Sequence, residues 1–245
     1  MRINVLGVGF VDATMTQAVT RAYELIQEGS KTYVVTPNPE IVWQCRRNEA
    51  LLNAVNSAGL VLPDGIGIII GAKILGTPLR GGRVQGIDFA SALMEKLAAA
   101  GGSVFLLGAK QGIAAEAGEK LIERFPGLVV AGVADGYFTD DLPVIENINA
   151  ANPDLLLVCL GAPKQELWIA NNIQKLSARL CVGLGGALDV FAGKVNRAPV
   201  FYRRFGLEWL YRTIREPWRI KRIAVLPLFV FAVSLKRLSG GRKRS

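Results

Sequence analysis

The sequence contains no histidine and only three cysteines. Histidine is the side chain that most often moves protons near neutral pH, so an acidic residue is the expected base if this protein transfers a proton. Cys45, Cys159 and Cys181 are too few and too scattered for a disulfide framework or a zinc site. Cys159 and Cys181 fall in apolar runs, where we expect them to be small buried hydrophobic residues.

Two nucleotide-binding signatures are also missing. The chain has no Gly-x4-Gly-Lys-Ser/Thr loop, which excludes an ATPase of that type. Asp12 stands where a dinucleotide fingerprint beginning at Gly7 would need its third glycine, which disfavours an oxidoreductase with a nucleotide cofactor. The first residues, MRINVLGVGF, lack a basic segment followed by a long apolar core, so we expect a cytoplasmic protein without a signal peptide.

Positive charge is concentrated at one end of the 245 residues. Residues 201–245 hold 12 of the 29 Lys and Arg but two of the 20 Asp and Glu, so they carry +10 and the first 200 residues carry −1. Such a tail should seek phosphates, on nucleic acid, an anionic lipid or a diphosphate substrate. Because the neutral body offers no second basic surface and the tail includes a long apolar run, we expect no nucleic-acid partner.

The basic tail predicts a helical appendage, residues 200–245, on an α/β core of residues 1–199. Leu207–Arg215 reads as an amphipathic helix, and four arginines at spacings of three, four and three share one helical face if the kink at Pro217 preserves the phase. They are Arg212, Arg215, Arg219 and Arg222. The mostly apolar residues 223–235 are too few to span a hydrocarbon core, which needs about 20, so we expect them to lie in a membrane interface; a dimer-interface helix is the alternative.

Short apolar runs alternate with helical patterns along the first 200 residues. This alternation predicts a Rossmann-like, mainly parallel sheet with helices on both faces. The expected strands are Ile3–Leu6, Thr32–Val35, Leu60–Leu62, Ser103–Leu107, Leu128–Val133, Leu155–Leu160 and Leu180–Gly183. The expected helices lie near Thr14–Glu28, Pro39–Asn48, Gly86–Ala100, Ile113–Phe125, Pro143–Ala151 and Glu166–Ser177.

Ligands of such sheets bind at the carboxyl ends of the strands, and four polar clusters are expected there. They are Thr36-Pro-Asn-Pro-Glu40, Pro63-Asp-Gly65, Arg83-Val-Gln-Gly-Ile-Asp88 and Ala162-Pro-Lys-Gln-Glu166. Each has a plain structural reading: Pro-Asp-Gly is a turn signature, and Asn38 or Gln165 can serve loop backbone groups. Their convergence on one edge is what suggests a site, with Asp64 either its base or only the polar residue of a turn.

Further strand ends suggest a nucleotide site. Gly108-Ala-Lys-Gln-Gly112 opens a helix, where backbone N–H groups can approach a phosphate, although glycines that only make a tight turn fit equally well. Asp189, after Gly185-Gly186, is a candidate acceptor for a base edge or ribose, or else a helix cap. Tyr137 is a candidate to stack on uracil, with simple packing as the alternative.

Several segments together resemble the WecG/TagA/CpsF glycosyltransferase family, and most of all its TagA type. They are TPNPEIVWQCRRN, LPDGIGIIIGAKILGTPLRGGRVQGIDF, LGAPKQELWI, GGALDVFAGKVNRAP and LEWLYRTIREPWR, in the same order over essentially the whole chain. The resemblance implies transfer of N-acetylmannosamine from UDP to the 4-hydroxyl of N-acetylglucosamine on undecaprenyl diphosphate, with inversion, for the linkage unit of wall teichoic acid. It also implies that Asp64 is the candidate base, that Thr36, Asn38 and Gln165 are polar active-site residues, and that the arginine-rich appendage completes the site and docks on the membrane.

The chemistry of an inverting transfer fits this sequence. It needs one base for the acceptor hydroxyl while the diphosphate leaves from the opposite face. The chain contains no Asp-x-Asp motif, so we expect no metal and no other cofactor, with arginines stabilising the leaving diphosphate. The candidates are Arg83, Arg212, Arg219 and Arg222. Gly108, Tyr137, Gly161 and Asp189 are the candidate nucleotide contacts.

The expected partners are therefore UDP-N-acetylmannosamine, the undecaprenyl-linked acceptor and the anionic inner face of the cell membrane, and a homo-oligomer is plausible. Two alternatives remain open. A relative in the same family would transfer N-acetylmannosaminuronic acid or another hexose. A basic-tailed binding module would have no catalytic activity at all.

Overall fold

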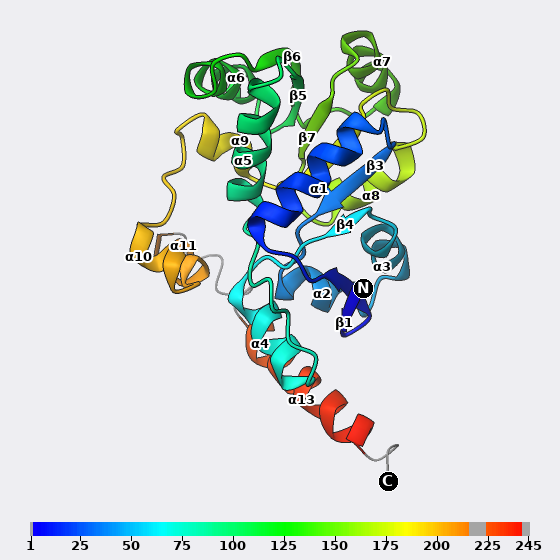
Figure 1. The fold of residues 1–245 in the computed structure, drawn as a ribbon, viewed down its shortest axis with the longest axis vertical. Helices are drawn as coiled ribbons and strands as arrows, with labels where there is room; N and C mark the ends of the chain where they lie inside the picture. Colours follow the sequence, from blue (N-terminus) through cyan, green and yellow to red (C-terminus); the bar gives the residue numbers. More distant parts are fainter. Residues whose placement is uncertain (1, 216–223, 242–245) are drawn as a thin grey trace.

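Six parallel strands organise the protein, and the computed structural model describes residues 2–215 and 224–241. The sheet has the order β4-β3-β8-β7-β5-β6. Its strands are β3 (Thr32–Val35), β4 (Leu60–Val61), β5 (Ser103–Gly108), β6 (Val129–Ala134), β7 (Leu155–Cys159) and β8 (Leu180–Gly183). Helices lie on both sides of it (Figure 1), which confirms the predicted fold class.

Alternating side chains of the strands divide the core into two halves. On β7, Leu155 and Leu157 join one hydrophobic cluster, whereas Leu156 and Val158 join the other, as the period of two in a strand requires. The helices of the first cluster are α1 (Met15–Gln27), α5 (Gly86–Ala98), α6 (Ile113–Arg124) and α9 (Ala187–Phe191). Those of the second include α2 (Pro39–Cys45), α3 (Glu49–Asn56), α4 (Ile66–Ile74), α7 (Asp141–Ala151) and α8 (Lys164–Asn172).

The first expected strand has a different partner from the one that the sequence suggested. It forms as β1 (Arg2–Val5) but pairs antiparallel with β2 (Val8–Val11), in a two-stranded sheet outside the parallel one. Leu6 and Gly7, with φ of 53° and 101°, make the tight turn between them, and backbone of that hand matches the twist of a hairpin. The glycines after the first strand therefore belong to a hairpin and its second strand.

Residues 39–74 form three helices, whereas the sequence predicted one. The expected helix Pro39–Asn48 ends at Cys45, and α3 begins after Asn48, whose Oδ1 accepts a hydrogen bond from the Leu51 amide at 3.0 Å. The apolar run Ile66–Ile74 is helix α4, which the sequence did not reveal. It contacts both α2 and the C-terminal helix α13, so it shows no clear polar stripe.

The C-terminal segment forms α10 (Val200–Arg204), α11 (Glu208–Arg215) and α13 (Val225–Gly241). Pro227 lies in the first turn of α13, where a helix tolerates proline. Helix α13 runs beside α4 and extends beyond the body (Figure 1), and it buries Phe229 and Val233 in the second cluster. The segment expected in a membrane interface thus packs one of its faces onto this chain. Within residues 2–215 and 224–241, no helix combines the length and apolar character needed to cross a bilayer.

Candidate active site

The carboxyl ends of the six parallel strands open onto one edge of the sheet, and the sequence-predicted residues gather there. Thr36 and Asn38 follow β3, and Asp64 follows β4. Gly161 and Gln165 follow β7, Gly108 ends β5, and Tyr137 follows β6. Asp189 lies on α9, directly after β8. Parallel pairing places these loops side by side, although their roles stay predictions.

The loops after β3 and β4 are joined by backbone hydrogen bonding. The Asp64 amide donates to the Pro37 carbonyl oxygen at 3.3 Å. Asn38 caps α2, because its Oδ1 accepts a hydrogen bond from the Ile41 amide at 3.0 Å. Gly65 then begins α4 with a φ of 90°, a value that favours glycine. Asp64 is therefore held, half-buried, between two helix starts.

The loop before α5 completes this part of the edge. The Val84 amide donates to the Pro63 carbonyl oxygen at 2.9 Å. A β-carbon on Gly86 would lie 3.0 Å from Thr36 Oγ1, so the start of α5 lies directly against the threonine hydroxyl. Three of the four polar clusters thus meet around Asp64.

Arg197, from the loop after α9, is clamped to the first turn of α5. Its Nη1 donates to Asp88 Oδ1 at 2.6 Å and its Nη2 to Oδ2 at 3.1 Å. The pKa of Arg197 is raised first by this hydrogen bonding, and the nearby carboxylates of Glu208 and Asp64 raise it further. Arg197 therefore joins the loop after α9 to the start of α5 by hydrogen bonds, and it also interacts electrostatically with Asp64.

Helices α10 and α11 attach to the same loop. Arg83 Nη2 donates to the Arg203 carbonyl oxygen, and Gln85 Nε2 donates to Glu208 Oε2, both at 2.5 Å. A β-carbon on Gly206 would lie 2.8 Å from Ile66 Cβ, so the turn between α10 and α11 packs closely on the start of α4. The first part of the appendage thus lies beside the Asp64 loop of its own chain.

The predicted arginines of the appendage are only partly described. Arg212 lies on α11, four residues after Glu208. Arg219 and Arg222 lie outside the described residues. Their expected role at the leaving group stays a prediction.

Gln165 connects the loops after β7 and β8. Its Oε1 accepts a hydrogen bond from the Gly185 amide at 2.7 Å, and its Nε2 donates to Glu166 Oε1 at 2.9 Å. The side chain is buried, and a β-carbon on Gly183 would lie 3.2 Å from Nε2. Gln165 therefore fixes the Gly185 turn at the edge of the sheet.

A second group of residues forms around the ends of β5 and β6. Gly108 has a φ of 135°, and a β-carbon there would lie 2.4 Å from the Cys159 carbonyl oxygen, so only glycine fits. The Gly136 amide donates to the Ala109 carbonyl oxygen at 2.9 Å, and Lys164 Nζ donates to Gly136 at 3.3 Å. Tyr137 is 74% exposed, so its ring is open to a ligand. The arrangement gives an exposed aromatic ring beside a lysine and a glycine turn.

The other two predicted nucleotide residues are near neighbours of these loops. Gly161 has a φ of 79° with open space where a β-carbon would be. Asp189 accepts backbone hydrogen bonds from Lys194 and Val195 through its carbonyl oxygen, which shapes the loop that leads to Arg197.

Comparisons with known proteins show the family of this chain. The sequence profile of the Glycosyl transferase WecG/TagA/CpsF family matches residues 3–243. The chain belongs to that family. It is therefore an enzyme that transfers a sugar.

Curated relatives narrow the similarity further. The chain is 38% identical over 225 residues to a protein of Bacillus spizizenii strain W23, an alignment covering 91% of this chain and 87% of the relative. It is 35% identical over 200 residues to a Bacillus subtilis strain 168 protein (82% and 78%) and 32% identical over 235 residues to one of Staphylococcus aureus MRSA252 (95% and 92%). All three are named N-acetylglucosaminyldiphosphoundecaprenol N-acetyl-beta-D-mannosaminyltransferase.

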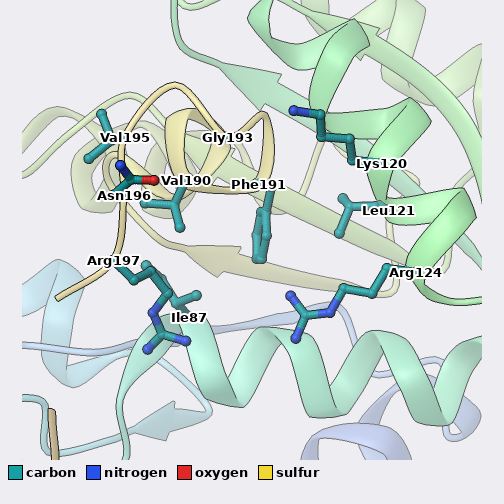
Figure 2. Close-up of a pocket in the computed structure, with 10 residues that line it drawn as sticks. All are labelled: Ile87, Lys120, Leu121, Arg124, Val190, Phe191, Gly193, Val195, Asn196 and Arg197. Carbon is teal, nitrogen blue, oxygen red and sulfur yellow. The ribbon is translucent and has the colours of Figure 1, made fainter. Parts of the chain in front are cut away.

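A small pocket of about 220 Å³ shares Arg197 with this site, but none of the predicted site residues lines it. Figure 2 shows cationic side chains around it, with Phe191 and Leu121 between them. These cations already have contacts: Lys120 Nζ donates to the Ala192 carbonyl oxygen at 2.6 Å, and Arg124 lies over the Phe125 ring at 4.9 Å. Arg197 is held by Asp88. Because all three cations have partners within the protein, we assign no ligand to the pocket.

The described part of the chain contains no group of three or more histidine, cysteine, aspartate or glutamate side chains able to hold a metal ion.

The sequence did not reveal some residues that the structure brings to the site. Asp88 and Lys164 lay inside quoted motifs without an assigned role, and Arg197 lay in the motif GKVNRAP. The connection between Arg197 and Asp88 became visible only in the structure, because the two residues are 109 positions apart in the sequence.

Proposed function

We propose that this enzyme transfers N-acetylmannosamine from UDP-N-acetylmannosamine to the 4-hydroxyl of N-acetylglucosamine on diphospho-undecaprenol. The product has a β-1,4 linkage, as in the linkage unit of wall teichoic acid. The names of the three relatives support the acceptor and the sugar, and their alignments cover most of both chains. The reaction also requires a residue that accepts the proton of the acceptor hydroxyl.

The observation that carries the proposal is the placement of Asp64. Its loop is hydrogen-bonded to the Thr36–Asn38 loop and to the loop before α5, whose Gln85 donates to Glu208 of α11. Three polar loops and the appendage therefore meet around one half-buried carboxylate. Glu166, a second carboxyl group at this edge, suits the role less well because it is buried, whereas Asp64 is half-buried and can face an acceptor. We assign Asp64 the role of general base toward the acceptor hydroxyl.

The proposed reaction is a single displacement that inverts the anomeric centre. Asp64 takes the proton of the acceptor hydroxyl as its oxygen bonds to the anomeric carbon, and the bond to the UDP oxygen breaks on the opposite face. Arg83, with Arg212, Arg219 and Arg222 of the appendage, stabilises the charge that develops on the diphosphate. In this proposal guanidinium groups, rather than a metal ion, neutralise the negative charge of the leaving diphosphate.

Acceptor-dependent UDP release tests this proposal. The reaction contains UDP-N-acetylmannosamine, a short-chain N-acetylglucosamine diphospholipid and EDTA. We expect release from the wild type, and a loss of about 100-fold or more in kcat for Asp64→Asn, the usual contribution of a general base. The matched control is Asp140→Asn, since Asp140 caps α7 and asparagine caps a helix equally well.

Each contrary outcome has its own meaning. Normal release by Asp64→Asn would remove Asp64 as the base. Release that requires a divalent cation would refute the metal independence. No release from the wild type would reject this donor or acceptor, and UDP-N-acetylmannosaminuronic acid would be the next donor to assay.

A further inference from the structure

Glu166 is a buried carboxyl group without a described counter-charge. It lies in the first turn of α8 and is 1% exposed. Its Oε1 accepts the hydrogen bond from Gln165, and its Oε2 is buried without a hydrogen-bond partner among the described residues. A carboxylate in such a place would lose its hydration with little in return.

Within residues 2–215 and 224–241, the charged and titratable groups of the neighbouring elements give Glu166 no cation. Cys45 on α2 is a buried thiol whose own pKa is raised to about 12, by burial and then by Glu166. Asp141 of α7 accepts hydrogen bonds from Trp168 and Asn172, farther along α8. Lys164 contacts Gly136 and the Phe138 ring instead. Burial raises the pKa of the Glu166 carboxyl, and the hydrogen bonds from Gln165 and from the Glu166 backbone only partly offset this.

The hydrogen bonding of Gln165 makes this carboxyl important for the site. Oε1 of Gln165 must face the Gly185 amide, which is a donor, while Nε2 needs an acceptor. Glu166 Oε1 supplies that acceptor. Without it the Gln165 amide can rotate by half a turn, which would place an NH2 group against the Gly185 N–H.

We propose that Glu166 is a positioning residue that acts as a neutral carboxylic acid, holding the Gln165 amide, and through it the Gly185 turn, in the geometry for donor binding. The inference rests on the proposed function of this edge as the donor site. A neutral acid accepts through its carbonyl oxygen and leaves only a hydroxyl, not a charge, at the buried Oε2 position.

Steady-state kinetics of four variants test the positioning role. Glu166→Gln keeps a neutral acceptor of the same shape, so we expect it to stay within about twofold of the wild-type KM for the UDP-sugar. Glu166→Ala should raise that KM about tenfold with a smaller change in kcat, the effect of about one lost hydrogen bond. The double variant Gln165→Ala/Glu166→Ala should be no worse than Gln165→Ala, because one residue acts through the other.

Two results would overturn the positioning role. One is additive losses in the double variant. The other is a Glu166→Gln enzyme as impaired as Glu166→Ala, which would show that the site needs the carboxylate charge.

Urea unfolding across pH tests the neutral state without any assay of activity. A folded-state pKa above the unfolded value means that the protonated group contributes its full stability below the unfolded pKa and loses it as pH rises. The folding constant of Glu166→Gln relative to wild type should therefore rise about tenfold per pH unit above about pH 4.5, until the folded-state pKa is reached. The control is the same substitution at an exposed position, Glu119→Gln on α6.

The two assays separate the two claims. A flat comparison for Glu166→Gln would refute the neutral acid, whatever the activity. The expected pH trend in a protein that releases no UDP would refute the proposed function and leave the protonation state of Glu166 established.

Discussion

The guanidinium of Arg197 grips the carboxylate of Asp88 through two hydrogen bonds, of 2.6 and 3.1 Å, although 109 residues separate them. Glu208 of α11 lies 4.0 Å from the same guanidinium, so one arginine connects the start of α5 with the appendage. Both partners of the clamp are half-buried. This pair therefore holds the surroundings of Asp64 together as well as joining two loops.

Breaking this clamp should cost stability. We expect Asp88→Asn to lower the free energy of unfolding by about 1–3 kcal/mol, the range for hydrogen bonds to charged groups. The measurement is urea unfolding at pH 7. The matched control is Glu28→Gln, which removes an exposed partner of Arg21 and should cost clearly less, because water screens a surface pair. Equal costs for the two variants would show that the clamp is no stronger than a surface pair.

The clamp should also have a characteristic pH dependence. Burial alone would raise the pKa of Asp88, but the hydrogen bonds from Arg197 and the charges of Arg203 and Arg83 hold it below its ordinary value. With the folded-state pKa lowered, its contribution is present above the unfolded value of about 3.9 and is lost as pH falls through the folded pKa. We expect the stability difference between wild type and Asp88→Asn to be constant above about pH 5 and to shrink below about pH 4. A difference that persists unchanged to pH 2 would contradict the paired carboxylate.

Helix α13 offers a matched pair of phenylalanines for a stability test. Phe229 is fully buried against α4, whereas Phe231, two residues along, is 64% exposed. We expect Phe229→Ala to cost about 3–5 kcal/mol of unfolding free energy and Phe231→Ala to change it by less than about 0.5 kcal/mol, measured by urea unfolding. Similar small effects for both would mean that α13 leaves α4 in solution.

This packing also bears on truncation of the appendage. Removing residues 200–245 would take Phe229 and Val233 out of the core cluster and expose the α4 side of their contact. Loss of activity in such a truncation would then mix a catalytic effect with a folding defect. Point variants on the outer face of α13 and on α11 separate the two.

The sequence predicted the sheet well because buried parallel strands are short, continuous apolar runs. Thr32–Val35 and Leu180–Gly183 have the predicted bounds. Helix α4 was not predicted because it contacts α2 at Gly67 and α13 at Gly71 while Ile70 stays exposed, so its isoleucines show no helical period. The Arg197–Asp88 clamp was not predicted for a related reason: the two residues are far apart in the sequence, and no local pattern indicates that the fold brings them together.

Site residues next to strand ends were easier to anticipate than those that act through others. Asp64 and Asn38 lie in short proline loops whose position follows from the sheet alone. Glu166 stood in a quoted motif, but nothing in the sequence distinguishes a buried glutamate from an exposed one in the first turn of a helix. Its proposed role depends on a lack of cations near it in the described part of the chain, which is a property of the assembled structure.

The outer face of α13 leads to the last prediction, which concerns the membrane. Four exposed apolar residues follow each other at spacings of three, four and three, which gives one stripe along the helix. They are Leu228, Phe231, Leu235 and Leu238. A stripe of this kind beside a basic tail suits adsorption to an anionic bilayer. We expect Phe231→Ser/Leu235→Ser to weaken binding to vesicles containing anionic lipid by at least about tenfold, since burial of each side chain is worth about 1.5–3 kcal/mol.

Vesicle sedimentation at low and high salt measures this binding. The control is Leu142→Ser on α7, a similarly exposed leucine outside the stripe. The wild type should bind less at high salt, because the basic residues contribute through screened charge. Sedimentation velocity decides the alternative: if the double variant binds vesicles normally but loses a dimer present in the wild type, the stripe is an interface between copies of the chain, and membrane adsorption must come from another part of the appendage.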